Sequence, residues 1–136
     1  MANPLDVTPL VRAVARLQDG LGRVHRDPAD ELLRDGLIHR FGLTYELFHR
    51  LLRRFIRQTA ASPEEVDQMT FQDLIRTANQ QALLSGDWPT WHRYRDLRAL
   101  TSHTYQADTA RKVAAAIPAF LAEAEYLRDQ LLARTK

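Results

Sequence analysis

Three residues in the last third of the chain could act together on a phosphate group. Arg98, His103 and Tyr105 form the pattern R-x4-H-x-Y. A histidine that titrates near neutral pH can take the proton from a ribose 2′-hydroxyl, and an arginine can stabilise the charge that then builds on the adjacent phosphate. This chemistry needs no metal ion. The three residues therefore indicate metal-independent cleavage of RNA as a candidate function.

Half of this pattern occurs a second time, because Arg34 and His39 have the same spacing as Arg98 and His103. Spacing alone does not rank the two pairs, but only His103 is followed by a tyrosine two positions later. Residues five apart on an ideal α-helix are separated by about 140° and do not share a face. We therefore expect Arg98 and His103 to converge only where the helix loosens or where a second subunit supplies the partner group. This favours a twofold dimer with a composite cleft.

Other familiar catalytic and metal-binding patterns are missing from the sequence. The five histidines include no i, i+4 pair and no HExxH motif, and the chain has no cysteine to supply a thiolate. The sequence also lacks a Gly-rich phosphate loop and a GxSxG nucleophile elbow. We therefore expect no bound metal and no cofactor.

The composition is that of a small globular protein. The chain has 136 residues, of which 45% are hydrophobic and 26% charged, and its formal net charge of +2 is too small to identify a nucleic-acid-binding protein. No apolar run approaches the roughly 18 residues of a membrane span, and the first ten residues lack the features of a secretory signal. We expect one domain over residues 1–136, located in the cytoplasm and not in a membrane.

The elements that must position the candidate residues are all expected to be helices. Apolar residues recur every three or four positions, and no window shows the alternation of a strand. The pattern predicts helices over about 6–24, from 27 or 30 to 58, from 71 to about 85, over 90–103, and from 108 or 109 to 133, with a helical turn after residues 62–63. Such helices must bury their apolar stripes on one another. We expect an all-α, antiparallel, up-and-down four-helix-type bundle with a short extra helix.

The second predicted helix carries the clearest apolar stripe, which we interpret as core or dimer interface. Its members are Leu37, Phe41, Tyr45, Phe48, Leu52 and Phe55. Gly36 and Gly42 interrupt this helix at a cost of up to about 1 kcal/mol each relative to alanine, so we expect a neighbouring backbone to pack closely there. Trp88 and Trp91 could have either of two roles. They could anchor the start of a helix, which is the commoner role, or provide platforms on which bases stack.

Two stretches of the sequence resemble a known family. Residues 34–47, RDGLIHRFGLTYEL, and residues 97–105, LRALTSHTY, followed by a long final helix, are similar to the nucleotidyltransferase substrate-binding-protein-like family, which includes the HepT toxins. The resemblance extends over roughly residues 5–134 and implies a HEPN-type bundle that forms a homodimer or a higher oligomer. It also implies that Arg98 and His103 form a ribonuclease site at the dimer cleft. Arg34, His39 and Tyr45 are then expected at the cleft or interface.

The resemblance implies partners as well. Tyr105 matches the tyrosine that a small MNT-type nucleotidyltransferase adenylylates to silence the toxin of a toxin–antitoxin pair, and RNA is the implied substrate. An older description casts such proteins as non-catalytic subunits that present substrate to a nucleotidyltransferase. Two positions depart from the family pattern: Ala99 stands where a polar residue is usual, and Gly42 stands where an acidic one is expected. Because the Ala99 side chain forms no hydrogen bond, the non-catalytic alternative stays open.

Overall fold

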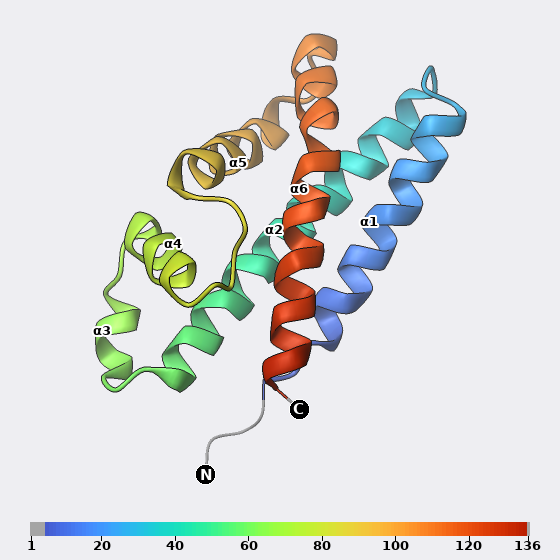
Figure 1. Ribbon diagram of the computed structural model, residues 1–136. Helices are drawn as coiled ribbons and strands as arrows, with labels where there is room; N and C mark the ends of the chain where they lie inside the picture. The colour runs from blue at the N-terminus through green and yellow to red at the C-terminus, as the bar shows by residue number, and fades with distance from the viewer. Residues whose placement is uncertain (1–4, 136) are drawn as a thin grey trace.

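The computed structural model describes residues 5–135, and every regular element in that range is helical (Figure 1). The four longer helices are α1 (Thr8–Arg26), α2 (Glu31–Thr59), α5 (Trp88–Leu100) and α6 (Ala107–Arg134). Two short helices, α3 (Pro63–Asp67) and α4 (Phe71–Gln80), lie between α2 and α5, and the single 3₁₀ turn η1 (Thr101–His103) joins α5 to α6. The predicted all-α class is confirmed.

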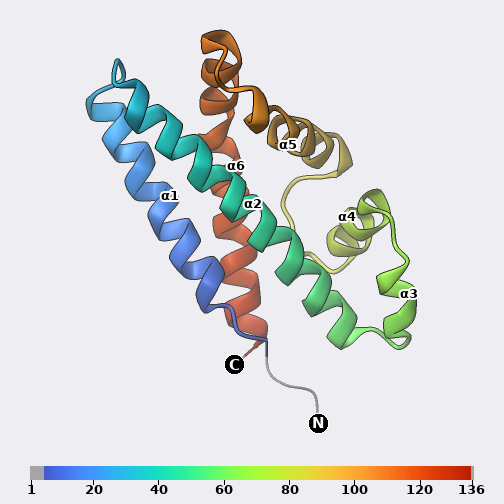
Figure 2. The ribbon, with the colours of Figure 1, turned by 180° about the vertical axis from the view of Figure 1, so that it is seen from behind.

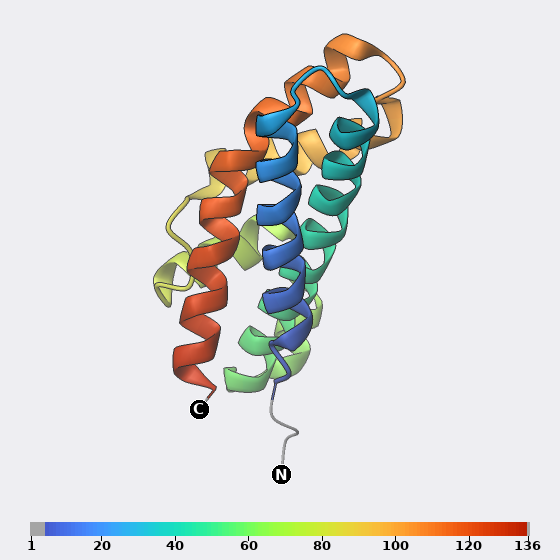
Figure 3. The same ribbon diagram turned by 90° about the vertical axis from the view of Figure 1, so that its right-hand side faces the viewer.

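The long helices form a bundle in which consecutive members run in opposite directions. Helices α1 and α2 make an antiparallel hairpin, and α6 packs against both of them (Figure 3). Helix α5 runs obliquely and contacts both α2 and α6. Seen from behind, α2 lies between α1 on one side and α4 and α5 on the other (Figure 2). No helix among residues 5–135 is long and apolar enough to cross a membrane.

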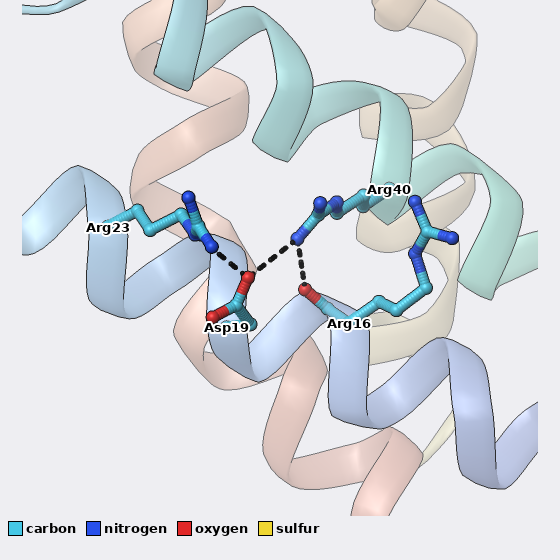
Figure 4. Close-up of polar contacts among 4 residues, drawn as sticks. All are labelled: Arg16, Asp19, Arg23 and Arg40. Atoms are coloured by element: carbon cyan, nitrogen blue, oxygen red, sulfur yellow. Dashed lines mark hydrogen bonds and ion pairs between the residues drawn. The ribbon is translucent and has the colours of Figure 1, made fainter.

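Polar contacts tie α1 to the first half of α2. Arg40 Nη1 donates hydrogen bonds to the carbonyl oxygen of Arg16 at 2.8 Å and to Asp19 Oδ2 at 3.3 Å, and Arg23 Nε donates to the same Asp19 oxygen at 3.0 Å (Figure 4). These two hydrogen bonds to the carboxylate lower the pKa of Asp19. Their contribution to stability is modest because the carboxylate is exposed, but they fix the register of the hairpin.

The predicted apolar stripe of α2 lies in the core. All six of its members are buried, and they pack around a cluster of aromatic rings that includes Phe120 of α6. Trp91 is fully buried and stacks on Phe48 with the ring centroids 4.3 Å apart. Trp88, by contrast, is half-buried at the surface of α5. One tryptophan is therefore a core anchor, and the other remains accessible.

Helix α4 begins as predicted but ends five residues early. Thr70 caps its start, because Thr70 Oγ1 accepts a hydrogen bond from the Asp73 backbone N–H at 3.1 Å. Its end is made by Ala82, which adopts a left-handed φ of 58°, while the Leu83 N–H donates to the carbonyl oxygen of Ala78 at 2.9 Å. Leu83 and its neighbour Leu84 are buried as irregular chain, inside the range over which the sequence predicts helix.

The expected backbone crossing at the two glycines of α2 is wrong. A Cβ at Gly36 would meet no atom within 4 Å, and a Cβ at Gly42 would face the side chain of Arg98 at 3.5 Å or more. What packs on Gly42 is therefore a guanidinium and not a helix backbone. This contact places Arg98 directly on α2.

Candidate functional site

The predicted trio lies where α5 gives way to α6. Arg98 is in the last turn of α5, His103 ends η1, and Tyr105 lies in the turn before α6. The helix loosens here because side-chain hydroxyls bind its terminal carbonyls: Thr101 Oγ1 donates to the carbonyl oxygen of Arg98 at 2.7 Å, and Ser102 Oγ donates to that of Ala99 at 3.1 Å. These local bonds compete with further helical bonds and end α5 after Leu100.

Arg98 is held by a carboxylate and a hydroxyl. Its Nη2 forms an ion pair with Glu46 Oε1, and its Nη1 donates to Thr101 Oγ1 at 2.9 Å. Its Nε is buried and has no hydrogen-bond partner among the described residues. The side chain is 33% exposed, so one edge of the guanidinium is open to solvent while the other rests on Gly42. Arg98 is thus pre-positioned, with donor capacity left over for an anion.

A hollow of about 330 Å³ opens beside this guanidinium. It lies between α2 and the end of α5, and it is lined by Asp35, Ile38, His39, Gly42, Leu43, Glu46, Arg98, Thr101 and Thr104. Hydroxyl, carboxylate, imidazole and guanidinium groups therefore share one small concave surface. The hollow is polar enough to receive a phosphate group together with part of a nucleotide.

His103 and Tyr105 lie next to each other at the end of the bundle where α5 gives way to α6. Their ring centroids are 6.4 Å apart in an edge-on arrangement, and Tyr105 is 80% exposed. His103 is also exposed, and neither residue is among those that line the hollow. One chain thus brings His103 and Tyr105 together beside the Arg98 hollow without placing the imidazole against the guanidinium.

Of the second arginine–histidine pair, Arg34 and His39, only His39 lines the Arg98 hollow. His39 is exposed and lines the same hollow as Arg98, whereas Arg34 is half-buried with its Nε unpartnered among residues 5–135. The hollow therefore contains an imidazole, but it comes from α2 and not from η1.

Tyr45 packs in the core instead of lining the Arg98 hollow. It is 7% exposed, and its ring lies 6.4 Å from that of Phe71 and 6.3 Å from that of Phe120. Burial raises its pKa to about 12. Glu46, the neighbour of Tyr45, is the residue that faces the Arg98 hollow, whereas Tyr45 borders a second hollow further along α2.

Glu46 and Thr101 are the site residues that sequence reasoning missed. Both lie inside the two stretches that carry the family resemblance, and both bind Arg98 directly. Glu46 is one helical turn after Gly42, where an acidic residue was expected, so the carboxylate is present one turn further along α2. The presence of an acidic residue one turn after Gly42 is the feature of the sequence from which Glu46 could have been predicted as a site residue.

Metal ligands do not gather in the described part of the chain. Among residues 5–135 there is no group of three or more histidine, cysteine, aspartate or glutamate side chains that could hold a metal ion.

The fold and the site together define a class: a small helical bundle with a polar, arginine-centred hollow beside an exposed histidine and tyrosine. Residues 5–133 match the family described as nucleotidyltransferase substrate binding protein like, and the chain belongs to this family.

Two matches in Haemophilus influenzae support this membership. One, named as a probable ribonuclease HepT, is 37% identical over 101 residues, which cover 74% of this chain and 68% of that protein. The other is a solved structure titled as the fold of a substrate-binding domain of a nucleotidyltransferase. It superposes with a TM-score of 0.86 at 30% identity, covering 93% of this chain and 98% of its own.

Proposed function

We propose that this protein is a HepT-like endoribonuclease that cleaves RNA without a metal ion. The observation that carries the proposal is the arrangement of Arg98, His103 and Tyr105 where α5 gives way to α6, beside a polar hollow of about 330 Å³. The relative named as a probable ribonuclease HepT supports it.

The chemistry assigned to these residues is transesterification. His103 takes the proton of a ribose 2′-hydroxyl, the 2′-oxygen attacks the adjacent phosphorus, and the bond from phosphorus to the 5′-oxygen breaks. The departing 5′-oxygen receives a proton from an imidazolium, so the products are a 2′,3′-cyclic phosphate and a 5′-hydroxyl. Arg98 stabilises the additional negative charge on phosphorus in the transition state.

A second copy of the chain is part of this proposal. Because His103 lies outside the hollow that holds Arg98, we propose a twofold homodimer in which the imidazole of one copy meets the guanidinium of the other. Subunit mixing tests this arrangement. Chains with Arg98→Ala and chains with His103→Ala are each expected to be inactive, whereas mixed dimers regain one intact composite site. Equal mixing should restore about one quarter of wild-type activity; no restoration would contradict the composite site.

Tyr105 is the proposed point of control. In this step its phenol oxygen attacks the α-phosphorus of ATP, pyrophosphate leaves, the phenol proton passes to solvent, and the added adenylate silences the ribonuclease. The catalyst is a partner nucleotidyltransferase of the toxin–antitoxin type. Tyr105 suits this role because it is the one exposed tyrosine of four, the others being half-buried or buried: Tyr45, Tyr94 and Tyr126.

Mass spectrometry tests the modification. The protein is incubated with a small MNT-type nucleotidyltransferase, ATP and Mg²⁺, and the peptide that contains Tyr105 is expected to gain the mass of one adenylate. Tyr105→Phe should abolish the gain, and Tyr126→Phe serves as the matched control that keeps it. Labelling that persists in Tyr105→Phe would refute this assignment.

A second candidate function is favoured by the ion pair at the site. Glu46 already neutralises Arg98, and Ala99 offers no hydrogen bond, which suits a non-catalytic adaptor that presents substrate to a nucleotidyltransferase. Such an adaptor is expected to co-purify with its partner in a stoichiometric complex and to leave RNA intact. Growth arrest when the chain is expressed without the partner would support the ribonuclease, and the absence of cleavage together with a stable complex would support the adaptor.

A further inference from the structure

A second hollow continues from the Arg98 hollow along the same side of α2. It has a volume of about 310 Å³ and is lined by Tyr45, Glu46, His49, Arg50 and Arg53. Glu46 borders both hollows, so the two concave surfaces are contiguous. From His39 to Arg53 the face extends about 21 Å along the helix, which is longer than a single nucleotide requires.

Aromatic rings and an arginine form a stack beside this second hollow. The guanidinium of Arg95 lies 5.3 Å from the ring centroid of Trp88 and 5.9 Å from that of Phe71. The ring of Phe71 lies 4.9 Å from that of His49, which lines the second hollow. Arg95 is exposed and Trp88 is half-buried, so a planar group can reach the stack from solvent. This is the arrangement on which bases of single-stranded nucleic acid stack.

The charges on this face are not balanced. Glu46 pairs with Arg98, and Arg53 keeps its charge while it donates to main-chain carbonyl oxygens. The other two carboxylates of the face are Asp96, 3.5 Å from the His92 imidazole, and Asp35, which lines the Arg98 hollow. Arg50 and Arg95 are the two arginines of this face whose guanidinium groups make no hydrogen bond or ion pair among residues 5–135.

Both of these arginines are exposed, and neither has a carboxylate within ion-pair distance in the described part of the chain. Together with Arg53 and Arg98 they set four arginines against three carboxylates, Asp35, Glu46 and Asp96, and this excess of positive charge suits a polyanion.

We infer that the face between α2 and α5 is a binding track for single-stranded RNA, with a base stacked at Arg95 and Trp88 and a phosphate at Arg50. This inference rests on the proposed function, because it names how the substrate of the same site is held. The track is sequence-tolerant, since stacking and phosphate contacts do not read base edges.

Fluorescence anisotropy with a labelled oligouridine tests the track. His103→Ala serves as the background so that the probe is not cut. Arg95→Gln is expected to weaken binding about tenfold, and Arg50→Gln to reduce the slope of log affinity against log salt by about 0.7. Arg26→Gln, at an exposed arginine that ends α1 and lines neither hollow, is the matched control and should leave affinity within about twofold.

Tryptophan fluorescence gives a second readout, which reports on the surroundings of Trp88. Trp91 is buried, so quenching on RNA binding is assigned to Trp88. Trp88→Phe retains an aromatic ring and is expected to keep most of the affinity but to lose the quenching. Quenching that survives in Trp88→Phe, or unchanged affinity in Arg95→Gln, would overturn the inference.

The outcomes separate this inference from the proposed function. RNA cleavage by the wild-type chain with no effect of Arg95→Gln on RNA affinity would refute the track and leave the ribonuclease. RNA binding that depends on Arg95, with no cleavage, would refute the ribonuclease and leave the track. If Arg95→Gln weakens capture of the nucleotidyltransferase but not of RNA, the face belongs to the protein partner and the inference is wrong.

Discussion

Glu46 acts as an internal anion for Arg98, so its removal is expected to strengthen RNA binding. Glu46→Gln keeps the size of the side chain and removes its charge. The pair is partly solvated, with Arg98 33% and Glu46 50% exposed, and exposed ion pairs contribute at most about 1 kcal/mol to stability. We therefore expect the free energy of unfolding in urea to fall by less than about 1 kcal/mol.

The effect on binding follows from the same pair. Two unit charges 4 Å apart interact by about 1 kcal/mol in water and by about 4 kcal/mol at an effective dielectric constant of 20. At this exposed site the lower figure applies, so a phosphate that no longer competes with Glu46 should bind about fivefold more tightly.

The assay is fluorescence anisotropy with oligouridine in the His103→Ala background at two salt concentrations. Glu64→Gln, which removes an exposed carboxylate on α3, is the control for net charge. Equal gains from Glu64→Gln and Glu46→Gln would refute the local competition, and weaker binding in Glu46→Gln would show that Glu46 itself holds the RNA.

Three further predictions concern stability, measured as the free energy of unfolding in urea. Gly36→Ala should stabilise the fold by up to about 1 kcal/mol because the new Cβ meets no atom within 4 Å. Gly86→Ala should destabilise the fold because the new Cβ would strike the buried Glu123 carboxylate. A Gly86→Ala variant more stable than Gly36→Ala would contradict this packing. Ala82→Gly should stabilise by about 1 kcal/mol or less by relieving the left-handed backbone, and a loss would refute the strain. Burial lowers the pKa of His49 below 6.5, so stability should fall as pH drops from 7 to 5, and more steeply than in His49→Gln.

The sequence was most informative where apolar spacing repeats over many turns. The stripe of α2 was predicted in full, and each member is buried, because side chains three and four positions apart must share a face. The end of α4 was missed because an alanine adopts the conformation that usually marks a helix end with glycine. Leu83 and Leu84 then continue the apolar pattern outside any helix.

The site was predictable only in part. The R-x4-H-x-Y pattern located the junction of α5 and α6, and the calculation for an ideal helix indicated that Arg98 and His103 do not share a face. The contact between Arg98 and Glu46 joins positions 52 residues apart, so no local spacing could reveal it. The same holds for the stack of Arg95 on Phe71, because it joins side chains of two separate helices, α5 and α4, which pack against each other.

The family is shown by the match over residues 5–133, whereas the activity depends on what Arg98 and His103 do together. The most direct measurement is product analysis after incubation of the purified chain with an RNA oligomer in EDTA, beside the same oligomer with a 2′-deoxy sugar at the cleavage position. The account predicts a 2′,3′-cyclic phosphate from the ribose substrate, no product from the deoxy substrate, and no product from the Arg98→Ala/His103→Ala variant. Cleavage of the deoxy substrate, or cleavage that survives both substitutions, would contradict it.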